Sequence, residues 1–219
     1  MNTLKAYLRM DMLRILPFLG VIGILVLIGT VMLYLPEAGF SKMGFLLLRH
    51  LTIVFGLILG ADLAARDREQ KTRTGVEALP KAPLETFVIR CLIRLAVILI
   101  LWGALIVYTD HILGAVFPGR LHIVSLVHWY HSEADVTHQV SVILLSIFTF
   151  FSGTLCSMFM PDTLTSIGAS AAVAVGCALY NSRYNNSYMV TILLLMVIFA
   201  LLSALIYASR QPWDLSSQS

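Results

Sequence analysis

Two membrane-length apolar runs are separated by one charged stretch, Asp62-Leu-Ala-Ala-Arg-Asp-Arg-Glu-Gln-Lys-Thr-Arg-Thr-Gly-Val-Glu-Ala-Leu-Pro-Lys-Ala-Pro-Leu-Glu85. The rest of the chain is strongly apolar: 58% of its 219 residues are hydrophobic, 12% are charged, and the mean hydropathy is +0.86. Soluble domains are far less apolar than this. The composition therefore predicts a polytopic membrane protein, which must meet its soluble partners through the few polar segments it has.

Six apolar runs approach or meet the length of a bilayer span, which is about 20 residues of helix across roughly 30 Å. The runs are continuous and do not alternate every second residue, so they predict helices and not barrel strands. We expect an all-α fold with one transmembrane domain over residues 1–219. Its spans lie near Ile15–Leu35, Phe45–Ala65, Phe87–Phe117, Val140–Met160, Thr163–Tyr180 and Tyr188–Ser209.

Basic residues near the ends of the spans predict the orientation, because Lys and Arg are retained on the cytoplasmic side. With the N-terminus inside, only Lys42, Arg49, Arg120 and Arg183 fall outside, and the other eleven of the 15 basic residues fall inside. An even number of spans and two cytoplasmic termini in the cytoplasmic membrane follow. The net charge of +3 reflects this topology and predicts no nucleic-acid partner.

The chain carries no recognisable ATP site. Gly114-Ala-Val-Phe-Pro-Gly119 has the glycine spacing of a phosphate-binding loop but lacks the following Lys-Ser/Thr. Neither Cys-x-x-Cys nor His-Glu-x-x-His spacing occurs, so no closed metal site is predicted. The three cysteines all fall in predicted spans, at Cys91, Cys156 and Cys177.

The charged stretch has the features of a short cytoplasmic helix followed by a turn. Two acid–base pairs stand four residues apart in the favourable order, Asp67 with Lys71 and Glu69 with Arg73. Gly75 ends or turns this helix, and Pro80 forces an extended break before the third span. An ordinary solvated loop is the alternative interpretation.

At these residues the chain resembles the permease subunits of ABC transporters of the ABC-2, or type V exporter, family. Members of this family carry an acidic residue near the cytoplasmic end of span two and a Gly-Thr-x-Glu-x-Leu-like turn. A proline and a basic residue then lead into span three. In this chain those places are taken by Asp67 or Glu69, by Gly75-Val-Glu-Ala-Leu-Pro80 and by Arg90.

The resemblance implies an ABC-2 type permease fold in which residues 66–80 are the coupling helix, seated in a groove of a separate ABC ATPase subunit. ATP and Mg would be held by that partner, and this chain would hold no cofactor and would not itself be an enzyme. The implied cargo is hydrophobic or amphipathic, such as a peptide or bacteriocin, a lipid or a drug, moved outward. The implied coupling residues are Arg66, Asp67, Glu69, Arg73, Gly75, Glu77 and Pro80.

The N-terminal stretch, residues 1–13, resembles the connecting helix of the same family, which lies along the inner membrane surface. Leu8 and Leu13 can face lipid while Lys5 and Arg9 face headgroups, as in an interfacial amphipathic helix. A helical extension of span one is the alternative.

A stripe of small residues, Gly168, Ala172 and Gly176, shares one face of the fifth run. Such a stripe lets helices approach closely in lipid. The resemblance implies a dimer with a second permease copy or a paralogue, in which this helix lines the pathway. Packing inside one protomer accounts for the stripe as well.

The external segment 118–139 is rich in histidine. Trp129 and Tyr130 favour an interfacial gate or re-entrant helix, because aromatic and histidine side chains suit the membrane interface. A metal, haem or pH-sensing site is the minority alternative. Its weak candidate ligands are His128, His131, Glu133 and His138.

Three arginines in the apolar runs are expected to reach the headgroups, Arg49 at the outer face and Arg90 and Arg94 at the inner face. The interior of the bundle should then be apolar, which suits an amphipathic cargo. Two other classes of function stay open: an intramembrane enzyme such as a protease, and a stand-alone immunity or scaffold protein.

Overall fold

The computed structural model describes residues 2–35, 38–69, 83–109, 133–183 and 188–209. Within these ranges the chain is helical and contains no strand, which confirms the all-α prediction. The helices are α1 (Asn2–Tyr34), α2 (Ala38–Glu69), α4 (Pro83–Val107), α6 (Glu133–Phe159), α7 (Thr163–Arg183) and α8 (Tyr188–Ser209).

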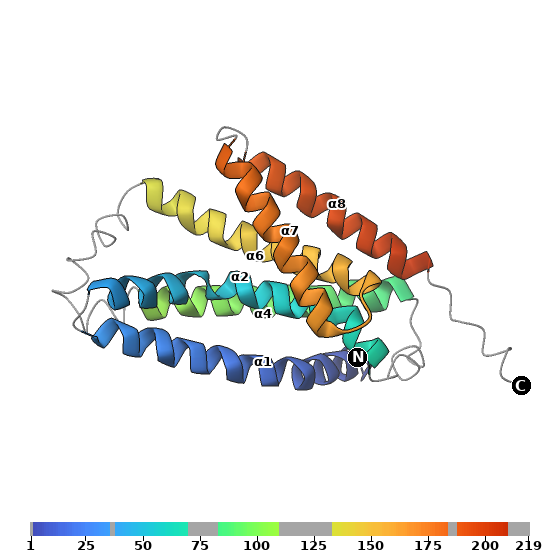
Figure 1. The fold of residues 1–219 in the computed structure, drawn as a ribbon. Coiled ribbons are helices and arrows are strands. Elements are labelled where there is room, and N and C mark those ends of the chain that lie inside the picture. Colours follow the sequence, from blue (N-terminus) through green and yellow to red (C-terminus); the bar gives the residue numbers. More distant parts are fainter. Residues whose placement is uncertain (1, 36–37, 70–82, 110–132, 184–187, 210–219) are drawn as a thin grey trace, which may run out of the picture.

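The helices form an up-and-down bundle in which α2 lies between α1 and α6, and α7 and α8 pack on the α6 side (Figure 1). The start of α1, the end of α2, the start of α4 and the end of α8 lie at the same end of the molecule. We refer to this as the N-terminal end of the bundle. Residues 70–82, which follow α2 and precede α4, therefore connect to the bundle at this end.

Four helices contain candidate membrane spans: Leu8–Tyr34, Leu46–Ala65, Leu84–Val107 and Val140–Phe159. The described parts of α7 and α8 contribute shorter apolar segments, Thr163–Gly176 and Thr191–Tyr207. Four of the predicted spans are thus long and apolar enough to cross a membrane, and the count of six stays a prediction. The predicted third span, Phe87–Phe117, agrees with α4 as far as Val107, a π turn follows at Tyr108 and Thr109, and its residues 110–117 lie outside the described chain.

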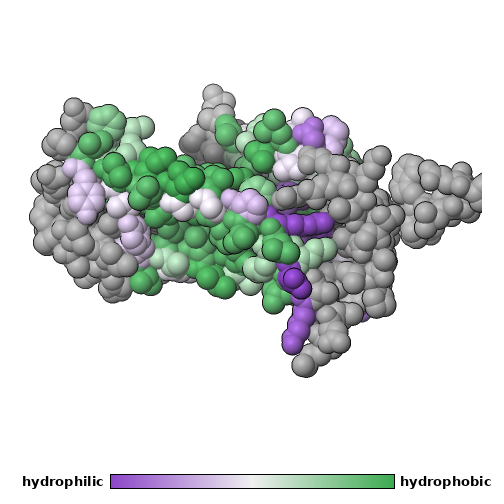
Figure 2. All heavy atoms as spheres, turned by 90° about the horizontal axis from the view of Figure 1, so that it is seen from below, coloured by the Kyte–Doolittle hydropathy of each residue, from purple (hydrophilic) through white to green (hydrophobic). Residues whose placement is uncertain are grey.

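The first helix runs without interruption from Asn2 to Tyr34, so residues 2–13 and the first span form one helix. An interfacial position of residues 1–13 stays a prediction. Large apolar side chains cover the outside of α1, α4, α7 and α8. On the face seen in Figure 2, hydrophobic residues spread over the helices while strongly hydrophilic ones gather toward the N-terminal end. This outer surface fits a membrane protein, whose outside faces lipid.

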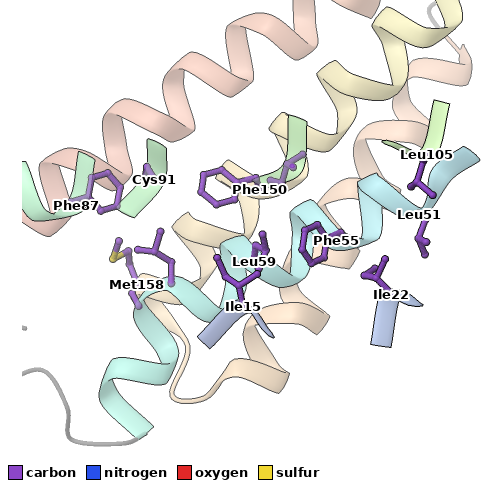
Figure 3. Close-up of a cluster of buried hydrophobic side chains, with 13 residues drawn as sticks. Ile15, Ile22, Leu51, Phe55, Leu59, Phe87, Cys91, Leu105, Phe150 and Met158 are labelled. Atoms are coloured by element: carbon purple, nitrogen blue, oxygen red, sulfur yellow. The ribbon is translucent and has the colours of Figure 1, made fainter. Parts of the chain in front are cut away.

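The core lies between α1, α2, α4 and α6 (Figure 3). Every fourth residue of α2 points into it, and Leu51, Phe55, Leu59 and Leu63 are all buried. This spacing keeps the four side chains on one face of the helix. Ile15 and Ile22 come from α1, and Phe87, Ile98 and Phe150 come from the helices opposite.

An adjacent face of α2, about 100° around the helix, carries glycines that allow backbone contact with α6. A Cβ atom at Gly60 would lie 2.0 Å from the carbonyl oxygen of Phe150, and one at Gly56 would lie 2.3 Å from that of Ser146. Gly153 of α6 is also close to α2, because a Cβ atom there would lie 2.7 Å from Leu57 O and from Ala61 N. This small-residue packing is the closest helix contact of its kind in the described chain, and it holds α2 against α6.

Local sequence explains where two of the helices begin. Pro83 is the first residue of α4, where its missing N–H costs no hydrogen bond, and Glu85 lies in the first turn near the positive end of the helix dipole. The Asp162 carboxylate caps α7 by accepting a 2.7 Å hydrogen bond from the backbone N–H of Thr165.

Replacing Gly60 with alanine tests the contact between α2 and α6. We expect a loss of about 1–3 kcal/mol in stability, because the added methyl must push two backbones apart. Gly23→Ala is the matched control, since no atom lies within 4 Å of its Cβ position. Thermal unfolding of the purified variants in detergent measures the difference. Equal melting temperatures for the two variants would contradict the described packing.

Candidate functional site

Within the described chain, four buried charged side chains are joined by ion pairs inside the bundle. They are Asp11 of α1, Asp62 of α2, and Arg90 and Arg94 of α4, with relative exposures of 0%, 1%, 0% and 0%. We call these four residues the charge cluster. Its position among apolar helices makes it the candidate functional site, because ionisable groups inside a membrane domain are costly and commonly functional.

The expectation that Arg90 and Arg94 reach the inner headgroups is wrong, and so is the expectation of an apolar interior. Both guanidinium groups turn into the bundle, where carboxylates and backbone carbonyls satisfy them. The two arginines lie six and ten residues after Leu84, the first residue of the span in α4. At 1.5 Å per residue, Arg94 is about 15 Å along the helix from that point.

The two arginines of α4 have the same four-residue spacing as the two backbone carbonyls of α2 that they bind. Arg90 Nη2 donates to the Leu63 carbonyl at 3.1 Å, and Arg94 Nη1 donates to the Leu59 carbonyl one turn away. Arg94 Nη2 also pairs with Asp62 Oδ2 at 3.1 Å. The two arginines and the two carbonyls are each four residues apart, so the antiparallel helices meet in register. A helical carbonyl can accept these bonds because it has two lone pairs.

The contacts to α1 are longer and rest on a single oxygen. Asp11 Oδ1 accepts from Arg90 Nε at 3.4 Å and from Arg94 Nη2 at 3.3 Å. Good pairs of this kind measure about 2.7–2.9 Å. Within the described part of the chain, the buried atoms Asp11 Oδ2 and Arg94 Nε have no hydrogen-bond partner. Asp11 therefore satisfies the arginines less completely than α2 does.

The formal charges of the cluster balance, with two carboxylates against two guanidiniums. Burial of charge is tolerated only with such pairing, because the desolvation cost is several kcal/mol per ion. Arg14, one turn after Asp11 on α1, is also buried, at 9% exposure. The cluster joins α1, α2 and α4 near the N-terminal end of the bundle.

The cluster is a network of ion pairs and not a proton-sharing pair of acids. Asp11 and Asp62 both bind the same nitrogen, Arg94 Nη2, so a guanidinium stands between them. A catalytic pair of aspartates must instead share a proton. This geometry can hold helices together or bind an anion, and it gives no support to an intramembrane protease.

The sequence did contain a signal for this site. Asp11 and Asp62 are single acids in apolar surroundings, and Arg90 and Arg94 are four apart on one helix face. In the predicted topology, all four residues lie toward the cytoplasmic side of the membrane. Matching two acids with two bases at equal depth would have indicated the cluster.

The predicted coupling residues fall mostly outside the described chain. The backbone of residues 66–69 forms the last turn of α2, which continues directly from Asp62. The side chains of those residues and all of residues 70–80 lie outside the description. Arg49 and the candidate metal ligands His128, His131, Glu133 and His138 have side chains outside it as well.

The small-residue stripe of α7 lies on the surface. Gly168, Ala172 and Gly176 are exposed, and nothing lies within 4 Å of a Cβ placed at either glycine. The described residues of the same chain therefore do not cover this stripe. Its role in a dimer or a pathway stays a prediction.

No family model matches the chain, and neither a curated protein nor a solved structure matches it.

A double-mutant cycle tests whether Asp62 and Arg94 stabilise the fold as a pair. Asp62→Asn and Arg94→Gln should each cost about 3–5 kcal/mol, because each leaves a buried charge uncompensated. The double variant restores neutrality, so its loss should be clearly smaller than the sum. Chemical or thermal unfolding in detergent gives the three free energies.

The control for this cycle is Arg9→Gln, because Arg9 lies on α1 with its side chain exposed. We expect its stability to change by no more than about 0.5 kcal/mol. Additive losses in the double variant would contradict direct pairing.

Proposed function

We propose that the chain is the permease subunit of an ATP-driven exporter of the ABC-2 type, with ATP hydrolysis on a separate subunit. Its cargo is a hydrophobic or amphipathic molecule, such as a peptide, a lipid or a drug. The observation that carries the proposal is the bond between Arg94 and Asp62. It ties together α2 and α4, which are the two helices on either side of the charged segment 66–82.

This bond has a mechanical consequence for the segment. A displacement of residues 66–82 acts on the end of α2 and on the start of α4 at once. Because Arg90 and Arg94 also bind the Leu63 and Leu59 carbonyls, these two helix ends move as one unit. A segment that is attached to both of these joined helix ends can transmit the motion of a soluble partner to the bundle, as a coupling helix must.

Two further features support the proposal. The sequence contains no phosphate-binding loop with Lys-Ser/Thr, which fits the proposed placement of ATP hydrolysis on a separate subunit. The exposed stripe of Gly168, Ala172 and Gly176 offers a surface for a second permease copy or a paralogue. We place the protein in the cytoplasmic membrane with both termini in the cytoplasm, on the basis of its Lys and Arg distribution.

Cysteine labelling tests the orientation. Thr72→Cys and Ser217→Cys should be shielded from an impermeant thiol reagent added to intact cells, whereas Ser132→Cys should react. The background replaces the three native cysteines with alanine, at Cys91, Cys156 and Cys177. Labelling of Thr72→Cys from outside would overturn the proposed topology.

Charge reversal at Glu77 tests the coupling segment. Glu77→Lys should reach normal membrane levels, because the change lies outside the apolar spans and keeps the basic bias. Association with the ATPase should fall, or ATP hydrolysis should lose its dependence on substrate. Gly75→Val should act similarly, since valine does not tolerate the turn conformations open to glycine. Co-purification and ATPase assays of the complex provide the measurements.

The matched control is Asp135→Lys, which reverses a charge in the external segment. It should leave ATPase association unchanged. Normal association and transport in both Glu77→Lys and Gly75→Val would favour the solvated-loop interpretation. If the wild-type chain binds no ATPase at all, the immunity or scaffold alternative takes its place.

A further inference from the structure

The first turns of α1 divide their charges between two faces of the helix. Asp11, the only acid in α1, is buried in the charge cluster. Lys5 and Arg9 are exposed, and neither forms an ion pair with a described residue. They are one turn apart and leave the helix on the same side, while Asp11 lies about 160° around the helix from Arg9. The outer face of this helix end therefore carries two positive charges and no acid of its own.

Both basic residues lie at the level of a membrane boundary. The apolar span of α1 begins at Leu8, so Lys5 lies about 4.5 Å before that point along the helix and Arg9 about 1.5 Å after it. The headgroup layer is roughly 5–8 Å thick on each side of the hydrocarbon. Lys and Arg side chains are long enough to reach this layer from both positions. The two cations are therefore placed at the depth of lipid phosphates.

The same face of α1 continues into the span as an exposed apolar strip. Leu8, Leu13 and Leu16 are 45%, 63% and 62% exposed. By helix geometry all three lie within about 80° of Lys5 around the helix. Only 17% of the apolar window of this span is buried inside the described bundle. A molecule that combines an anionic head with hydrocarbon chains matches both parts of this surface.

We propose that Lys5 and Arg9 form a binding site for the headgroup phosphate of an anionic phospholipid, whose acyl chains lie along the exposed leucines. Arg binds phosphate oxygens through parallel N–H donors, and Lys supplies a compact positive charge. A zwitterionic headgroup carries a cation of its own, which opposes binding at two basic residues. In the proposed orientation the site faces the cytoplasmic leaflet, whose surface is negatively charged. The site needs no ATPase, so it stands apart from the proposed permease function.

Titration with two lipids that share their acyl chains tests the site. The purified chain is kept in an uncharged maltoside detergent, and native mass spectrometry measures the binding of dioleoyl phosphatidylglycerol and dioleoyl phosphatidylcholine. Each basic residue near an anionic lipid surface strengthens binding about fivefold. With two such residues, we expect the wild-type chain to bind its first phosphatidylglycerol about 25-fold more tightly than its first phosphatidylcholine.

Variants locate the preference on α1. Lys5→Gln/Arg9→Gln should lose most of it, and it should fold because both side chains are exposed. Lys5→Arg/Arg9→Lys keeps the two charges and should keep the preference. The matched control is Lys42→Gln/Arg183→Gln, which removes two positive charges at the opposite end of the bundle, near the start of α2 and at the end of α7. This control should bind phosphatidylglycerol as the wild type does.

Two further measurements separate a lipid from a free anion. Inorganic phosphate at the same concentration should not displace phosphatidylglycerol, because it lacks the chains that cover the exposed leucines. In lipid nanodiscs, a larger fraction of phosphatidylglycerol should raise the melting temperature of the wild type more than that of Lys5→Gln/Arg9→Gln.

Equal affinity of the wild type for the two lipids would overturn the proposal, and so would an unchanged preference in Lys5→Gln/Arg9→Gln. An equal loss in Lys42→Gln/Arg183→Gln would also overturn it, since net charge alone would then explain the binding. Displacement by inorganic phosphate would reject the lipid as the ligand. Each of these results leaves the permease function untouched, because co-purification with an ATPase measures that function separately.

Discussion

The arrangement of α1, α2 and α4 depends on the rule that a charge buried in apolar surroundings needs a partner. Arg90 and Arg94 cannot stay in the bundle unless carboxylates and carbonyls meet them at the right depth. Apolar packing alone would select the register of these helices less strictly, because contacts between leucine side chains are non-directional and have similar energies in neighbouring registers. The pairing of Arg94 with Asp62, supported by the carbonyls of Leu59 and Leu63, selects one register.

In the described chain, the face of α2 that contacts α6 is held by close backbone packing and not by ion pairs. There Gly56 and Gly60 bring the backbone against α6, and hydroxyl groups add bonds between the helices. Ser146 Oγ donates to Thr52 Oγ1 at 3.1 Å, and Thr149 Oγ1 donates to the Ile53 carbonyl at 3.0 Å. α2 is thus fixed by charge on one face and by close backbone contact on the other.

The sequence predicted the helical class because long apolar runs allow few other structures in a membrane. It located four runs that the structure bears out as candidate spans. The charge cluster was missed because each arginine was judged alone, by its distance from the nearest headgroups. Its partners Asp11 and Asp62 are 83 and 32 residues away from Arg94 in the chain, and pairing at such separations follows from the topology of the bundle and not from local pattern.

The order of the charges along the chain has a consequence for assembly in the membrane. Both acids precede both arginines, and Asp11 is separated from Arg90 by 79 residues. At roughly 5–20 residues per second, synthesis of that interval takes about 4–16 s, during which neither aspartate has its final partner. The contacts of Asp11 with Arg90 and Arg94 can therefore form only after α4 has been made, so the N-terminal part of α1 reaches its final contacts late.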